Sequence, residues 1–140
     1  MGEGYEMRIQ GWESKLEEYI EAQRQTPFTW GENDCVLFAA NAVNLIIDRD
    51  LSADIGKYGA YDKAGAVDII REHGGSIKGI FDAYLIRRLI KSAQRGDVAV
   101  VKIDGREAAG IVTGRYVVCK TPEGVGFVSL DNAVAIWEVR

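Results

Sequence analysis

The spacing of apolar and polar residues divides the chain into a helical first part and a strand-rich second part. Within residues 11–25, apolar side chains recur at helical spacing, with charged residues between them: Trp12, Leu16, Tyr19 and Ile20. Such a pattern predicts an amphipathic helix that packs through one face. Pro27 disfavours helical geometry at the residue before it, so we expect this helix to end by Thr26.

The next predicted helix is the most apolar segment of the chain. It begins at Asn33 or Asp34, both favourable N-cap residues, and runs through CVLFAANAVNLIID, residues 35–48. Because nearly every face of this helix is apolar, we expect it to be buried on most sides.

Two further helices are predicted before the pattern changes. Asp62 is a favourable N-cap for residues 63–73, and the glycines that follow at 74 and 75 would end that helix. A shorter helix is predicted over IFDAYLIRRL, residues 80–89. The acidic stretch IIDRDLSADIG, residues 46–56, reads as a solvated loop after the end of the second helix.

From Gly96 onward, short β-type runs alternate with turn-forming residues. Five strands are predicted, at DVAVVKI, AAGIVTG, RYVVCK, GFVSL and AIWEV. Helices followed by strands predict an α+β fold, here N-terminal helices packed on a five-stranded antiparallel, barrel-like sheet. We expect one domain over 1–140, made of an N-terminal helix (1–26), a helical half (27–95) and a strand half (96–140).

Composition and charge narrow the functional classes. With 47% apolar and 27% charged residues, the chain has the composition of a soluble globular domain. Its net charge of −4 argues against nucleic-acid binding. The first residues lack the apolar core of a signal peptide, and no apolar run is long enough to insert into a membrane. Two distant cysteines do not form a disulfide framework, so we expect synthesis and retention in a reducing cytoplasm, unless the protein leaves within a larger assembly.

Cys35 is the main candidate for chemistry, because it stands at the predicted start of the buried helix. The positive end of the helix dipole and unpaired backbone N–H groups would favour its thiolate form. Alternatively, a cysteine within an apolar run is a small buried side chain without a chemical role. The spacing of residues leaves both interpretations open.

The ordered motifs NDCVLFAANAV, RGDVAVV and AAGIVTG resemble the NlpC-type family of papain-like cysteine peptidases. The resemblance extends from about Pro27 to Val128 and implies the fold of that family, a helical part followed by a barrel-like sheet. The phrases PFTWGENDC and AIWEVR are most similar to a branch encoded in tailed-phage genomes near the tail-tip genes.

The resemblance also implies roles for individual residues. Cys35 matches the nucleophile, Asp34 the acidic residue before it, and Gly96 with Asp97 the opening of the first strand. Ala108 stands where the family has its general-base histidine, and no orienting polar residue stands near Val118 or Cys119. A cysteine nucleophile needs a base to form its thiolate and to protonate the leaving group. We therefore interpret Cys35 as a vestigial nucleophile, with Asp34 acting as an N-cap.

Other residues offer weak substitutes for the missing base. His73 is expected in the last turn of a helix, where an imidazole suits the dipole, and it would reach Cys35 only if that loop folded back. Cys119 is expected on the same strand face as Val117, either packed in the core or paired with Cys35 in a redox couple. The cysteines and histidine lack the close spacing of zinc ligands, so we expect no metal and no cofactor.

Two functions follow from the resemblance. The first is a non-catalytic NlpC-like structural or assembly protein of a phage tail tip, located in the virion tail and bound to hub or distal tail proteins. The second is a cysteine peptidase that cuts peptidoglycan with an unconventional base. In both cases a peptide groove could remain over Cys35. Trp30, Trp137, Tyr58 and Tyr61 are candidate anchors for a protein partner.

Overall fold

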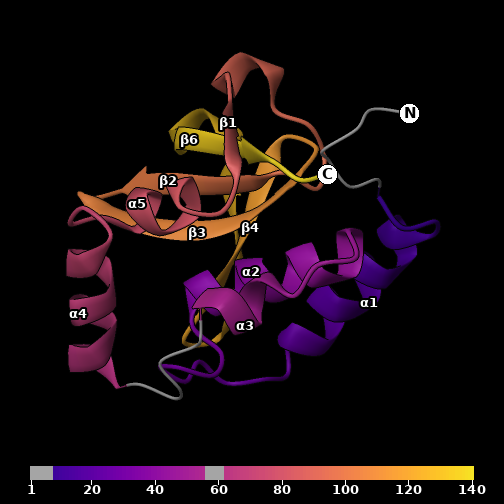
Figure 1. The fold of residues 1–140 in the computed structure, drawn as a ribbon. Helices are drawn as coiled ribbons and strands as arrows, with labels where there is room; N and C mark the ends of the chain where they lie inside the picture. Colours follow the sequence, from indigo (N-terminus) through magenta and orange to yellow (C-terminus); the bar gives the residue numbers. More distant parts are fainter. Residues whose placement is uncertain (1–7, 56–61) are drawn as a thin grey trace.

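The computed structural model describes residues 8–55 and 62–140, which form an α+β fold (Figure 1). The helices of this part are α1 (Trp12–Gln23), α2 (Cys35–Ile46), α3 (Leu51–Ile55), α4 (Lys63–Glu72) and α5 (Ile77–Asp82). The strands are β1 (Ile86–Arg88), β2 (Val98–Ile103), β3 (Arg106–Thr113), β4 (Tyr116–Thr121), β5 (Gly124–Ser129) and β6 (Ala133–Glu138). Short 3-10 turns, η2 (Ile90–Ser92) and η3 (Leu130–Asn132), follow β1 and β5.

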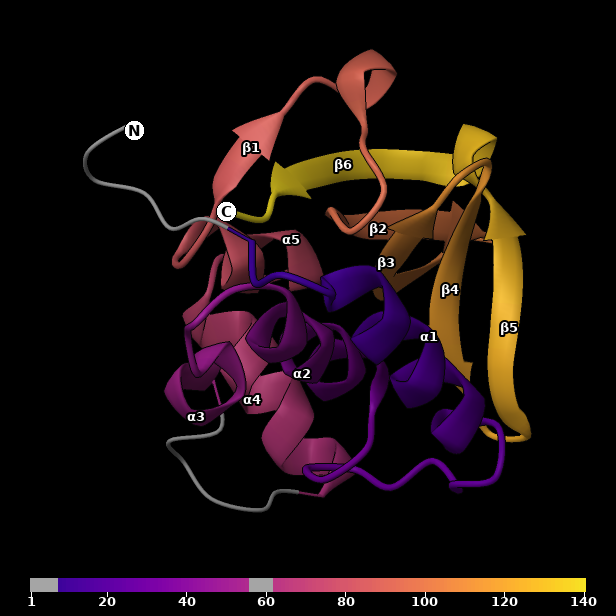
Figure 2. The same cartoon turned by 90° about the vertical axis from the view of Figure 1, so that its right-hand side faces the viewer.

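The strands form one antiparallel sheet in the order β1-β6-β2-β3-β4-β5. The sheet thus has six strands instead of the predicted five, and it is open, with β1 and β5 at its two edges. Figure 2 shows it as a strongly curved layer above and beside the helices. The predicted α+β class, with helices first and strands afterwards, is confirmed; the barrel is replaced by an open sheet.

The additional strand comes from a segment that was predicted to be helical. Helix α5 ends at Asp82, and Ile86–Arg88 pair with Ile136–Glu138 of β6. The apolar residues of 80–89 do recur at helical spacing, but Ile86 and Leu89 are 69% and 66% exposed. A helix over this range would have had a buried apolar face, whereas here backbone pairing with β6 decides the local structure.

The central helix α2 packs against strands β3 and β4 of the sheet and against helices α1 and α3 (Figures 1 and 2). Its residues are buried almost throughout, which confirms the predicted all-round apolar helix. The main core cluster joins this helix to one face of the sheet through the side chains Val98, Val100, Ala109, Ile111, Ala135 and Trp137. A smaller cluster covers the opposite face of the sheet, where Ala99, Val101, Val112, Val117, Cys119 and Ile136 meet.

The acidic stretch after α2 was predicted to be a loop, but it contains helix α3. Leu51 and Ile55 are 0% and 2% exposed, so two apolar residues anchor this short helix in the core. The N–H of Leu51 bonds to Asn44 Oδ1 at 2.7 Å, and the N–H of Ala53 bonds to Asp50 Oδ1 at 3.1 Å. Asp50 therefore acts as a helix cap, a role that its acidic neighbours concealed in the sequence.

Helix α1 ends as Pro27 predicts, and β4 is attached to that end by a buried lysine. Lys120 is 4% exposed, and its ammonium group donates to the carbonyl oxygen of Gln23 at 2.7 Å and also to that of Thr26. The last carbonyl groups of a helix have no partner within the helix. The ammonium group of Lys120 is such a partner, and it joins β4 to the end of α1, two segments that lie far apart in the sequence.

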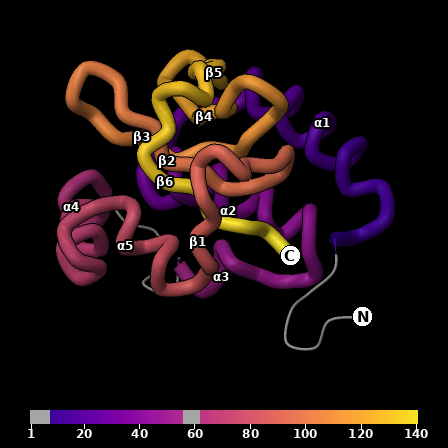
Figure 3. Tube along the Cα trace, turned by 90° about the horizontal axis from the view of Figure 1, so that it is seen from above, coloured from indigo at the N-terminus to yellow at the C-terminus, as the bar shows by residue number. Residues whose placement is uncertain are grey.

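Asp97 connects three segments at the start of β2. Its carboxylate is completely buried, accepts the N–H of Gln94 at 2.8 Å, and lies 3.3 Å from the guanidinium of Arg8 and 3.0 Å from that of Arg88. Arg8 also donates to the carbonyl oxygen of Val139 at 2.9 Å. Figure 3 shows the end of β6 passing beside β1, where these segments converge. In the described part of the chain, no helix is long and apolar enough to span a membrane.

Candidate functional site

The start of α2 is fixed by the carboxylate of Asp34. Oδ1 accepts the N–H of Leu37 at 2.9 Å, and Oδ2 accepts the N–H of Gly31 at 3.0 Å. The residue is only 2% exposed. The predicted N-cap role of Asp34 is confirmed, because the carboxylate satisfies an N–H of the first helical turn and holds the preceding loop against it.

Cys35 is the first residue of α2, and its environment favours the neutral thiol. Burial raises the pKa of Cys35 to about 11, and the negative charge of Asp34 raises it further. Backbone hydrogen bonds from Ala109, from Cys35 itself and from Val36 act in the opposite direction without offsetting the burial. Cys35 keeps part of its surface exposed, yet protein atoms surround the thiol closely enough for desolvation to dominate over the helix N-terminus.

The thiol of Cys35 contacts the backbone of β3 at Ala109, next to the point where the pairing between β3 and β4 ends. The N–H of Val112 bonds to the carbonyl of Asp97 on the β2 side of the strand, so alternation directs the N–H of Ala109 to the opposite edge. On that edge, pairing with β4 begins only at Gly110, opposite Cys119. The N–H of Ala109 is therefore available to the thiol rather than to a neighbouring strand.

Ala108, the position where the resemblance expects a base, lies next to this contact. Ala109 belongs to the core on the α2 side of the sheet, whereas Ala108 packs against the cluster on the opposite face. The residue of β3 that touches the thiol is thus Ala109, through its backbone. Neither alanine carries a group that accepts a proton.

Cys119 and Cys35 pack in different core clusters, on opposite faces of the sheet. Burial raises the pKa of Cys119 to about 12, and Cys35 contributes to this shift. Cys119 and Val117 pack in the same cluster, as strand alternation predicted. Gly110 leaves room for the sulfur, since a Cβ atom at this glycine would lie 2.8 Å from Cys119 Sγ.

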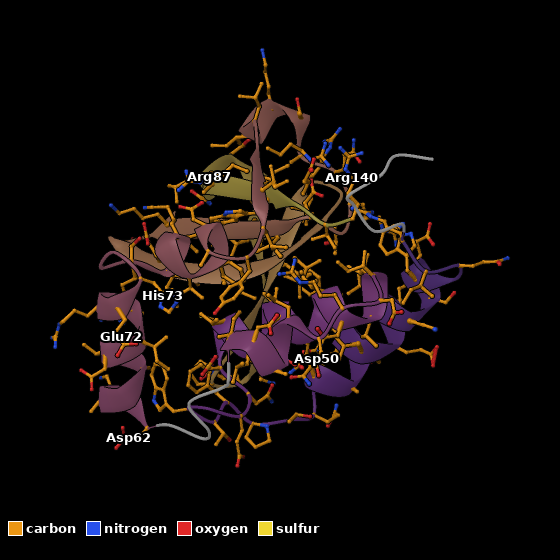
Figure 4. The ribbon with its side chains drawn as sticks, in the orientation of Figure 1. Asp50, Asp62, Glu72, His73, Arg87 and Arg140 are labelled. Atoms are coloured by element: carbon orange, nitrogen blue, oxygen red, sulfur yellow. The ribbon has the colours of Figure 1, made fainter. Side chains whose placement is uncertain are left out.

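His73 stands at the end of α4, at the position predicted from the sequence. It caps the helix, its Nδ1 lies 2.7 Å from the carbonyl oxygen of Ile69, and its ring centroid lies 6.5 Å from that of Tyr84. Figure 4 shows it on α4, close to α5. His73 is not among the groups that shift the pKa of Cys35. The two glycines after it have φ angles of 86° and 84°, which end the helix.

A pocket of about 390 Å³ opens beside Cys35. Helices α3, α4 and α5 contribute its apolar wall: Ile55, Ala66, Ile69, Ile70, Ile77 and Ile80. Trp30, which is 40% exposed, lies on its α2 side, and Arg106 and Glu107 line it from the start of β3. We did not predict this pocket from the sequence. Its lining residues come from segments that lie far apart in the sequence, so no local pattern indicated it.

The aromatic residues that were candidate anchors for a protein partner differ in their exposure. Trp137 is completely buried and donates its indole N–H to Asp82 Oδ1 at 2.9 Å, so it is a core residue and the prediction of an interface anchor is wrong. Trp30 remains accessible, and Tyr58 and Tyr61 lie outside the described residues. In residues 8–55 and 62–140, no three cysteine, histidine or acidic side chains are grouped in a way that could hold a metal ion.

The comparison with protein families covers nearly the whole chain. The model of a family described as a domain of unknown function, DUF6950, matches residues 7–139. The chain belongs to the DUF6950 family. No curated protein and no solved structure matches it. Asp34, Cys35, the adjoining strand β3 and the pocket all lie within the DUF6950 match, so the candidate site is part of the family domain.

Proposed function

We propose that this protein is a non-catalytic, NlpC-like structural or assembly component of a phage tail tip, which binds other tail proteins such as hub or distal tail proteins. The observation that carries the proposal is the environment of Cys35. Its thiol is held in the neutral form by burial, and its partners are backbone groups. Acyl transfer by a cysteine requires a thiolate and a group that returns a proton to the leaving amine.

The order of the parts supports a papain-like scaffold. An Asp-Cys pair opens a buried helix, and the cysteine meets a strand of an antiparallel sheet that follows in the sequence. The association with a phage tail, and the location in the virion, rest on the similarity of PFTWGENDC and AIWEVR to the tail-tip branch.

A substitution of Cys35 in a phage that encodes this chain tests the non-catalytic role. With Cys35→Ala, we expect tails of normal composition and unchanged infectivity, because the sulfur serves only packing. Asp97→Ala is the matched control, since it removes a buried carboxylate that joins three segments and should reduce tail assembly. Normal tails that fail to infect after Cys35→Ala would contradict the proposal.

The second candidate is a peptidoglycan-cutting cysteine peptidase. Its support is the position of Cys35 at a helix N-terminus, beside a pocket and within reach of the backbone N–H groups of Ala109, Cys35 and Val36. Incubation of the purified protein with muropeptides, followed by mass spectrometry, distinguishes the candidates. Cleavage that is lost in Cys35→Ala would favour the peptidase, and intact muropeptides favour the structural role.

A further inference from the structure

The pocket beside Cys35 has the composition of a site for a small apolar ligand. Its wall is built mainly from isoleucine side chains of α3, α4 and α5, and its volume of about 390 Å³ lies in the range of small-molecule sites. The polar residues that line it are few: Asp34, Cys35, Arg106 and Glu107. An apolar ligand would therefore be oriented by charge at one end of the pocket.

The charge at the β3 end of the pocket is positive. Glu107 and Lys78 neutralise each other, since Lys78 Nζ lies 2.6 Å from Glu107 Oε2 and both side chains are partly buried. Arg106 is exposed and forms no ion pair with any residue of the described ranges. The carboxylate of Asp34 is buried and bonded to two backbone N–H groups at the opposite, α2 side. Among the described residues, the guanidinium of Arg106 is thus the charged group of the lining that no ion pair neutralises at this end of the pocket.

We propose that this pocket binds a small amphipathic carboxylate, with its alkyl body among the isoleucines of α3, α4 and α5 and its carboxylate on Arg106. A guanidinium presents paired donors that suit a carboxylate. This inference goes beyond the structural role proposed above and is independent of it, because binding requires neither the thiol nor a tail protein.

Length of the alkyl chain is the first variable of the test. Calorimetric titration of the full chain with hexanoate, octanoate and decanoate, each below its micellar concentration, should show saturable binding. We expect the dissociation constant to fall by about fourfold for each added methylene group, as burial of one methylene predicts. The absence of saturable binding for all three would overturn the proposal.

The charge of the head group is the second variable. Decanoate should bind more tightly than decanol or decylamine. In Arg106→Gln, the dissociation constant of decanoate should rise by about threefold to tenfold, and that of decanol should stay the same. Arg115→Gln removes the same charge from an exposed residue between β3 and β4 and should have no effect. Equal binding of decanoate and decanol by the unmodified protein would contradict the role of Arg106.

A substitution that fills the pocket locates the ligand. Ala66 lines the pocket from α4, whereas Ala64 on the same helix is exposed and does not line it. Ala66→Phe should abolish decanoate binding, and Ala64→Phe should preserve it, with circular dichroism confirming that both variants are folded. Unchanged binding in folded Ala66→Phe would show that the ligand lies elsewhere and would overturn the proposal.

Discussion

Two ionisable side chains stand at the starts of two core elements, Asp97 before β2 and Cys35 at the first position of α2, and their surroundings differ. Asp97 opens β2 in contact with two guanidinium groups and the N–H of Gln94. Cys35 opens α2, and its hydrogen-bond partners among the described residues are backbone groups, beside the negative charge of Asp34. Burial raises the pKa of both side chains. Backbone N–H groups oppose this shift at both, but at Asp97 two guanidinium groups oppose it as well, whereas at Cys35 the charge of Asp34 increases it.

The difference indicates which of the two sites is built to hold a charge. A buried charge is tolerated where partners replace its hydration, and a group without such partners remains neutral. Asp97 has these partners from three segments of the chain, so it is suited to join them. Among the described residues, Cys35 has backbone N–H partners but no neighbouring cation that shifts its pKa, which is the arrangement expected of a side chain that fills space at a helix start.

The largest effect is expected from removal of the Asp97 carboxylate. Asp97→Ala would leave Arg8 and Arg88 without their shared partner, and we expect a loss of roughly 3 kcal/mol in the free energy of unfolding. Urea denaturation measures this loss. Asp68→Ala is the control, because Asp68 and Arg71 form an ion pair whose side chains are 67% and 75% exposed, and its loss should change stability little.

A smaller effect is expected at the helix cap. Asp34→Ala removes the acceptor for two backbone N–H groups and should cost about 1–2 kcal/mol in thermal or urea unfolding. Asp34→Asn keeps a capping oxygen but removes the charge, so we expect most of the stability to return and the pKa of Cys35 to fall. The pH dependence of iodoacetamide labelling at Cys35 measures this fall. If Asp34→Asn leaves that dependence unchanged, the charge of Asp34 does not influence the thiol.

The smallest change in stability is expected from Cys35→Ala, on the order of 1 kcal/mol or less at neutral pH. Its effect should depend on pH. The folded pKa of about 11 lies above that of an unfolded cysteine, near 8.5, so the neutral thiol contributes stability below about pH 8.5 and loses it as the pH approaches 11. We therefore expect the wild type to lose stability relative to Cys35→Ala as the pH rises over this range. A wild type that gains stability relative to Cys35→Ala with rising pH would contradict a raised pKa.

Local signals in the sequence were enough to predict several elements. Asp34 and Asp62 cap the helices that they were expected to cap, because capping depends on the residue and its next few neighbours. The five predicted strands all form, since period-2 patterns and intervening turn residues are local too. The position of Cys35 at the helix start also followed from the sequence.

Features that depend on distant partners could not be predicted in this way. Strand β1 exists because β6 pairs with it, and the apolar spacing of its residues favours a helix when taken alone. The pKa of Cys35 depends on the closeness of β3, seventy-four positions away at Ala109. The pocket arises from isoleucines on three helices whose arrangement no local pattern specifies.

The most direct test of a neutral, non-catalytic thiol is the pH dependence of Cys35 alkylation. Iodoacetamide labelling should be followed by peptide mass spectrometry, so that Cys35 and Cys119 are quantified separately, and circular dichroism should confirm the fold at each pH. We expect labelling of Cys35 to be slower than that of an unfolded cysteine at pH 8 and to rise toward a midpoint near 11. Rapid labelling that reaches its plateau below pH 8 would reveal a stabilised thiolate and would contradict a non-catalytic Cys35.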